Sequence, residues 1–117
     1  MDQPKNLQQR TKKYSLDIIK VFQSLPKTTE AQILGKQLLR SGTSVGANTR
    51  SAFRGRSGKE FRAKLSIVVE EADEAIFWLE LIKESGILVC DDLENLIEES
   101  DALVSIFISI IKKNAES

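Results

Sequence analysis

The sequence predicts an all-α protein folded as an antiparallel up-down-up-down four-helix bundle. Four segments carry apolar residues at helical spacing, and no segment shows the strict alternation of a half-buried strand. The segments are separated by breakers of a few residues, and such short connections favour antiparallel neighbours. A length of 117 residues suits one domain with one core. We therefore expect a single domain over residues 1–117, with helices at about 7–24, 29–54, 58–85 and 91–113.

The first two expected helices are bounded by proline and by a cap. One apolar stripe defines the helix at 7–24, and it consists of Tyr14, Ile18, Val21, Phe22 and Leu25. Pro26 closes this helix because a proline forces the preceding residue away from helical angles. The second helix is expected to begin near Thr29, since Thr29 and Gln32 have the spacing of a capping box. It continues to about Arg54.

The third expected helix follows a turn opened by Gly55 and Gly58. Ser57 and Glu60 again have the spacing of a capping box at its start. Gly86 fits the left-handed position at which helices end. The core-facing stripe of this helix is Phe61, Leu65, Val68, Ala72, Ile76, Leu79 and Ile82.

The fourth expected helix starts with Asp91 or Asp92 as its cap. Its apolar residues are spaced close to a heptad pattern: Leu93, Leu96, Ile97, Leu103, Val104, Phe107, Ile110 and Ile111. We expect Cys90, just before it, to be a packing residue at a helix end. No histidine exists in the chain to activate its thiol.

Small residues are concentrated within the second helix. Residues 37–50 keep helical apolar spacing but contain Ser41, Gly42, Ser44, Gly46 and Ala47. Each glycine costs about 1 kcal/mol relative to alanine in a helix interior, so a close contact must offset that cost. We therefore expect a helix-packing motif that lets another backbone approach, formed by Ser41, Ser44, Gly46 and Asn48.

Charge is divided unevenly along the chain, although the net charge is zero. Residues 1–64 hold fourteen Lys or Arg and four carboxylates, a net charge of +10, whereas residues 65–117 hold three Lys and thirteen carboxylates, a net charge of −10. One interpretation is that basic and acidic helices lie side by side and neutralise each other. The other is that a basic surface is presented to an acidic partner such as RNA.

The densest basic segment surrounds the expected turn between the second and third helices. Between residues 50 and 64 there are six cations and one carboxylate, Glu60. We take as the candidate nucleic-acid interface Arg50, Arg54, Arg56, Lys59 and Arg62, hereafter the basic turn. Contacts from Arg and Lys to phosphates give affinity without base specificity. The nearby aromatics, Phe53 and Phe61, occupy apolar-stripe positions expected in the core, so base stacking is not expected.

Residues with the usual chemistry of catalysis or metal binding are scarce. With no histidine and one cysteine, the common zinc and di-iron constellations are excluded. The acidic cluster at Glu70, Glu71, Asp73 and Glu74 is expected to be solvated or paired with the basic second helix. We expect no catalytic residue, metal or cofactor, and hence no enzyme. No apolar run is long enough to span a membrane and the start has no apolar signal core, so we expect a cytoplasmic protein with no membrane partner.

Apolar residues in the third and fourth helices exceed a single stripe. In residues 76–82 and 106–111 they occupy most faces of the helix, which predicts that each of these segments is covered by other protein on more than one side. We expect a homo-oligomer whose interface includes Phe77, Trp78 and Ile108, because aromatic residues are enriched in interfaces. The alternative for Trp78 is that it seals the edge of the bundle.

Three segments between Leu34 and Leu88 together carry a family resemblance. They are the small-residue stretch, R-S-x-x-E-F-x-x-K-L from Arg56 and E-E-A-D-E-x-x-F-W-L from Glu70. The chain resembles the bacterial four-helix-bundle family first found encoded in intervening sequences of large-subunit ribosomal RNA genes. That family is similar to the accessory variability determinant of diversity-generating retroelements. The resemblance implies a ring-shaped homopentamer and, from the retroelement protein, a basic ring that binds nucleic acid and a reverse transcriptase. This chain departs from many relatives, which carry an acidic residue shortly after the motif Asn, in having Asn48-Thr49-Arg50-Ser51.

Two functions follow from these patterns. The first is a non-enzymatic oligomeric scaffold that binds RNA or DNA through a basic rim without sequence specificity. The alternative is a protein-interaction adaptor that docks a basic partner on its acidic surface.

Overall fold

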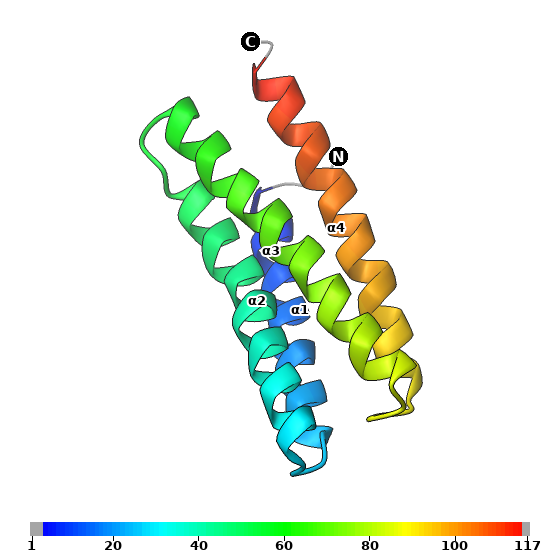
Figure 1. Ribbon diagram of the computed structural model, residues 1–117. Coiled ribbons are helices and arrows are strands. Elements are labelled where there is room, and N and C mark those ends of the chain that lie inside the picture. Colours follow the sequence, from blue (N-terminus) through cyan, green and yellow to red (C-terminus); the bar gives the residue numbers. More distant parts are fainter. Residues whose placement is uncertain (1–3, 116–117) are drawn as a thin grey trace.

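The computed structural model describes residues 4–115, and within them it contains four helices and no strand. They are α1 (Pro4–Ser24), α2 (Thr29–Phe53), α3 (Gly58–Glu84) and α4 (Asp91–Ala115). Each helix runs antiparallel to the next in a bundle of 48 × 20 × 19 Å (Figure 1). The all-α four-helix prediction is confirmed. None of the helices in residues 4–115 has an apolar stretch long enough to cross a membrane.

Packing is strongest between helices that are consecutive in sequence. α2 packs against both α1 and α3, and α3 packs against α4, whereas α1 and α4 touch only slightly. Figure 1 shows α4 leaning away from the other helices toward its carboxyl end. The α2–α3 turn lies at one end of the bundle, and the α1–α2 and α3–α4 turns lie at the other.

The helix α2 begins at Thr29 as predicted, but its cap lies one residue earlier than the sequence suggested. Thr28, not Thr29, is the cap: its backbone is extended, and its hydroxyl accepts a hydrogen bond from the Ala31 amide at 3.4 Å. The Gln32 side chain does not complete a capping box. Its amide instead donates to the Pro26 carbonyl at 2.9 Å, which fastens the turn to the helix.

The caps of α3 follow the prediction more closely. The Ser57 hydroxyl accepts from the Glu60 amide at 3.1 Å. The Glu60 carboxylate accepts from the Arg56 amide at 3.4 Å rather than from that of Ser57, so the second half of the capping box is shifted by one residue. At the other end, Gly86 has φ +77° and takes the expected left-handed position.

The start of α4 corrects two expectations. The helix begins at Asp91, so Asp91 and Asp92 both lie in its first turn, where carboxylates are favoured by the helix dipole, and neither precedes it as a cap. Cys90 was expected to pack at the helix end, but it is exposed in the α3–α4 turn.

The core contains apolar stripes from all four helices. Its largest fully buried side chains include Tyr14, Ile18, Leu38, Leu65, Leu79, Leu103 and Phe107. Ile76 was expected in the α3 stripe but is partly exposed, and Ala75 is buried instead. In a helix with 3.6 residues per turn, successive buried residues are three or four positions apart, and the buried residue after Ala72 is three positions on, not four.

Candidate nucleic-acid interface

Three glycines of α2 lie against α1 or the residue that follows it: Gly35 meets Phe22 and Leu25, and Gly42 and Gly46 lie further along the seam. A Cβ atom added to Gly42 would lie 2.7 Å from two side-chain carbons of Ile18, and one added to Gly46 would lie 2.7 Å from the Ser15 hydroxyl oxygen. The second position would also place the Cβ 3.2 Å from the Thr11 carbonyl oxygen, which belongs to the backbone. Across the same seam, the Ser15 hydroxyl donates to the Gly42 carbonyl at 3.0 Å. The glycines therefore set both the separation of α1 and α2 and their register.

The other residues of the expected packing motif have different surroundings. Ser41 is buried, and its hydroxyl donates to the Gln37 carbonyl of its own helix at 3.0 Å. Ser44 and Asn48 are partly exposed, and the Asn48 amide donates to the Ser44 carbonyl at 2.9 Å. Close contact with α1 is thus made by Gly46 together with Gly42, while Asn48 bonds within α2.

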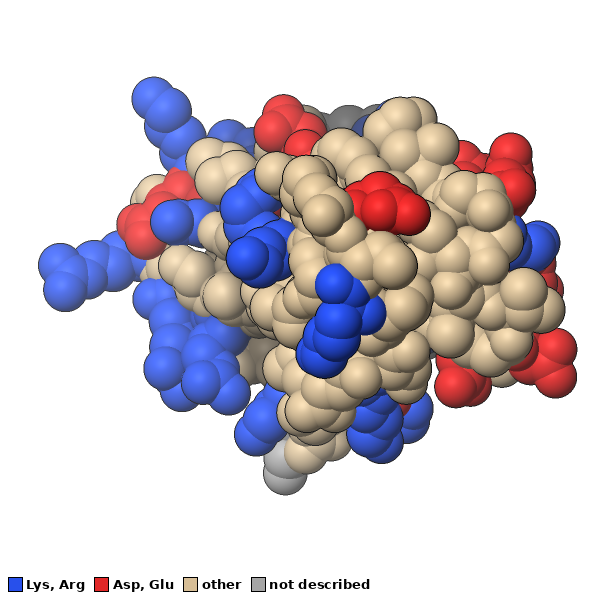
Figure 2. Space-filling model, turned by 60° about the horizontal axis from the view of Figure 1, so that its bottom comes forward, with Lys and Arg blue, Asp and Glu red and all other residues tan. Residues whose placement is uncertain are grey.

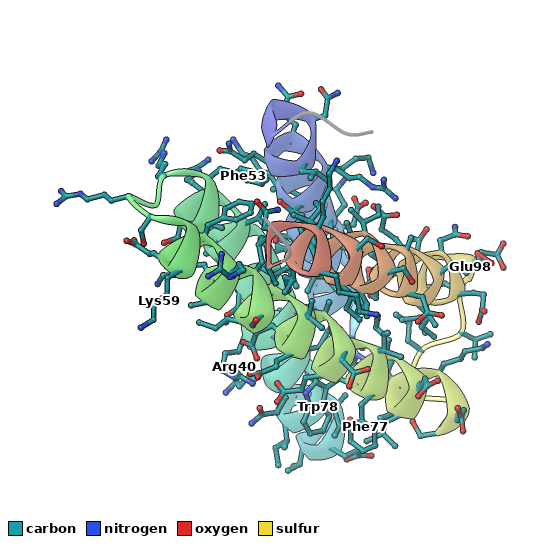
Figure 3. All side chains as sticks on the ribbon, turned by 90° about the horizontal axis from the view of Figure 1, so that it is seen from above. Arg40, Phe53, Lys59, Phe77, Trp78 and Glu98 are labelled. Atoms are coloured by element: carbon teal, nitrogen blue, oxygen red, sulfur yellow. The ribbon has the colours of Figure 1, made fainter. Side chains whose placement is uncertain are left out.

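The helix register brings the basic turn to one end of the bundle. Arg50 lies in the last turn of α2, and Arg54 caps that helix. Arg56 lies in the connection, and Lys59 and Arg62 belong to the start of α3. Figure 3 shows Lys59 projecting from this end. Among the described residues, none of the five has a carboxylate oxygen within 4.0 Å of its side-chain nitrogens.

Two features near the basic turn affect its charge and its surface. The Glu60 carboxylate accepts from the Arg56 backbone amide, so it subtracts one charge from the five cations without pairing with any of them. Phe53 and Phe61 pack edge to face, with ring centroids 5.2 Å apart, and both lie against the core. These rings support the turn from beneath and do not form a stacking platform for bases.

Acidic side chains are paired or placed elsewhere. Arg40, in the middle of α2, bonds Glu71 at 3.0 Å and also bonds Glu74, so part of the acidic cluster neutralises α2 as expected. Most of the remaining carboxylates lie on the second half of α3 and on α4. Figure 2 shows Lys and Arg concentrated at the left and bottom of the molecule and Asp and Glu concentrated at the right, with a few acidic groups also at the left and top. The bundle is 48 Å long, whereas charges are screened beyond about 10 Å at ordinary salt. The acidic α3–α4 turn is therefore too far away to neutralise the basic turn.

The contact between α1 and α4 includes two polar pairs that sequence patterns did not reveal. The buried Tyr14 hydroxyl lies 2.6 Å from the Ser100 hydroxyl, which itself donates to the Leu96 carbonyl at 2.7 Å. Tyr14 is therefore the donor in the pair. Burial raises the pKa of Tyr14 from 10.0 to about 12. Beside it, Arg10 makes two bonds of 2.8 Å to the Glu99 carboxylate.

The expected interface residues are only partly exposed. Phe77 is 52% exposed and Ile108 is 37% exposed. Trp78 packs against the core, and the Phe77 ring meets it edge to face with centroids 5.1 Å apart. The Trp78 indole nitrogen is buried and has no hydrogen-bond partner among residues 4–115. Figure 3 shows both rings on the side of α3 turned away from α4.

Comparisons with known proteins place the chain in a family. A family model described as 23S rRNA-intervening sequence protein matches residues 5–109. The fold is similar to the crystal structure of a protein of unknown function from the S23 ribosomal protein family of Bacteroides thetaiotaomicron. That chain is 32% identical, with a TM-score of 0.84 over 91% of this chain and 98% of its own length. No match is found among the curated proteins. The resemblance seen in the sequence is confirmed, whereas the relation to the retroelement protein stays a prediction. This chain belongs to the 23S rRNA-intervening sequence protein family.

Proposed function

We propose that this protein is a non-enzymatic, homo-oligomeric scaffold that binds the phosphate backbone of RNA, or of other nucleic acid, through the basic turn. The observation that carries the proposal is the cluster of five cations at one end of the bundle, with no carboxylate partner within 4.0 Å among the described residues. The names of the matched family and of the similar structure's family both refer to ribosomal components, which makes RNA the first ligand to test.

The physical basis of binding is electrostatic. Lys and Arg side chains that neutralise phosphates release condensed counterions, so affinity falls steeply as salt rises. Such contacts position the backbone but do not read the bases. With Phe53 and Phe61 committed to the core, binding should be tolerant of sequence.

The proposal includes assembly into a ring-shaped homopentamer. Its support is the half-exposed Phe77 and the family resemblance. Assembly would repeat the basic turn around one rim and raise the local potential. Light scattering should give a multiple of the 13.1 kDa chain mass at tens of micromolar, roughly where specific interfaces persist, and Phe77→Asp should lower that mass. A wild-type mass of 13.1 kDa would refute assembly.

A binding experiment tests the nucleic-acid contact. The combined variant Arg54→Gln, Arg56→Gln and Lys59→Gln removes three charges from the basic turn. A matched control, Lys20→Gln, Lys27→Gln and Lys36→Gln, removes three exposed charges elsewhere. Affinity is measured by fluorescence anisotropy for two single-stranded RNAs of unrelated sequence, over a range of salt.

The basic-turn variant should lose affinity equally for both RNAs. Its slope of log K against log salt should become shallower by about 2, because each of the three lost phosphate contacts contributes about 0.7 with single strands. Unfolding should be unchanged because exposed charges contribute little to stability. An equal loss in the control variant would contradict the assignment to this turn.

The adaptor function is the competing candidate. Glu98 and Asp101 are exposed on α4 and have no Lys or Arg partner within 4.0 Å among residues 4–115. Their charges could therefore meet a basic protein. Absence of RNA binding by the wild type at about 50 mM salt, where phosphate contacts are strong, would make this adaptor function the leading one.

A further inference from the structure

A second basic feature lies outside the basic turn, in a groove between α1 and α2. The groove has a volume of about 350 Å³, and Gly46 and Ala47 are among its lining residues. Lys12 lines it from α1 and Arg50 lines it from α2. It exists because the small residues of α2 allow the two helices to approach without large side chains filling the outer side of their seam.

The charge of this groove has one sign. Lys12 and Arg50 are both exposed, neither has a carboxylate within 4.0 Å among the described residues, and no Asp or Glu lines the groove. The hydroxyls of Ser15 and Thr43 also line it, but their protons are committed to the carbonyls of Gly42 and Leu39, at 3.0 and 2.7 Å. A ligand here would therefore meet two free cationic donors, and phosphate oxygens are acceptors that suit them.

The groove adjoins the basic turn through Arg50, which belongs to both. Arg50 and Arg54 are four residues apart on one helix, which places their Cα atoms about 6 Å apart along its axis. Lys12 stands across the groove on α1. The cations thus continue from the end of the bundle along the outer side of the α1–α2 seam.

We infer that this groove is a phosphate track that extends the proposed interface, so that one nucleic-acid backbone passes from the basic turn along the α1–α2 seam. The inference rests on the proposed function. Lys12, from the first helix, becomes a direct phosphate contact, and the small residues of α2 gain a second role, which is to keep the track open.

Two variants test the groove without removing any residue of the basic turn. Lys12→Gln removes its α1 cation, and Ala47→Glu places a carboxylate inside it at an exposed helical position. The matched controls are Lys27→Gln and Gln23→Glu, at exposed positions near the α1–α2 turn, at the opposite end of the bundle from the basic turn. Circular dichroism checks that all four variants are folded.

Binding to single-stranded RNA is measured over the same salt range as above. Lys12→Gln should make the salt slope shallower by about 0.7, the value for one phosphate contact with a single strand. Ala47→Glu should weaken binding more than Lys12→Gln does, because its carboxylate can pair with both cations of the groove and also repels phosphate. Bound RNA should also protect Lys12, but not Lys27, from chemical acetylation read by mass spectrometry.

The outcomes separate this inference from the function on which it rests. If the basic-turn variant weakens binding while Lys12→Gln and Ala47→Glu behave as their controls do, the groove is not part of the interface and the proposed function stands. If the wild type binds no RNA at about 50 mM salt, both proposals fail together. Acetylation of Lys12 that is unchanged by bound RNA would also overturn the inference.

Discussion

The two hairpins of the bundle differ in charge and in packing. The α1–α2 hairpin is basic, and its helices meet over glycines that sit against Ile18 and the Thr11 backbone. The α3–α4 hairpin is mostly acidic and fills its seam with larger buried residues such as Leu65, Leu103 and Phe107. The helices of the first hairpin thus pack with their backbones close together and leave cations exposed. The helices of the second hairpin are held together by large apolar side chains. The two proposals follow this difference: phosphate binding is proposed for the basic turn and the α1–α2 groove, and assembly for the α3 surface at Phe77.

The junction between the hairpins is also uneven. They meet extensively where α2 packs on α3, but α1 and α4 meet only slightly, through Tyr14 with Ser100 and Arg10 with Glu99. These polar pairs make the second contact specific in register but add modest energy. Substitutions on the two sides of α1 should therefore have different costs.

The largest expected effect is on the glycine side of α1. Gly46→Leu should lower the free energy of unfolding by about 3 kcal/mol or more, because the new side chain meets the Thr11 carbonyl, which cannot move aside as a side chain can. Chemical denaturation measures the change, with Ala47→Leu at the adjacent exposed position as the control. Ser44→Leu should cost less, since Ser44 is partly exposed. Equal midpoints for Gly46→Leu and Ala47→Leu would show that the α1–α2 seam is not closely packed.

A smaller effect is expected on the polar side of α1. Ser100→Ala leaves the buried Tyr14 hydroxyl without its acceptor and should cost about 1 to 3 kcal/mol. Tyr14→Phe should cost less, about 0.5 to 1.5 kcal/mol, because Ser100 keeps its bond to Leu96. The same denaturation experiment ranks the two variants. The reverse ranking would contradict the assignment of Tyr14 as donor.

The effect confined to the narrowest conditions is a loss of stability at high pH. The pKa of Tyr14 is about 12 in the folded protein and 10.0 without burial, so its proton is retained by the folded chain after the unfolded chain has lost it. The stability that comes from Tyr14 is complete below pH 10 and declines as pH rises toward about 12. Tyr14 is the single tyrosine of the chain, so the near-ultraviolet absorbance of tyrosinate reports it directly. Titration near 10 in the native protein would show that the hydroxyl is solvated, and Tyr14→Phe should remove this part of the alkaline loss.

Local signals in the sequence predicted the positions of the helices well, and the contacts between helices less well. Ser57 and Gly86 could be assigned because a cap and a left-handed glycine depend on a few adjacent residues. Thr28 was missed because adjacent threonines offer the same hydroxyl, and the choice between them depends on backbone angles in the turn. Small residues in α2 predicted a close approach, but not that Gly42 and Gly46 would face α1 while Asn48 bonded its own helix.

Features that join distant residues could not be predicted in this way. Tyr14 and Ser100 are 86 positions apart, and each alone is typical of a helix. Lys12 was one of many lysines until the α1–α2 register placed it across a groove from Arg50. The basic turn was predicted because its five cations are close in sequence, and the short connection between α2 and α3 keeps them at one end of the bundle.

The most direct test of the central claim is the affinity of the wild-type protein for two unrelated single-stranded RNAs as a function of salt. Phosphate binding by the basic turn and the α1–α2 groove predicts that log K falls linearly with log salt, with equal and steep slopes for both RNAs. No binding at about 50 mM salt, or a strong preference for one sequence that salt does not weaken, would contradict it.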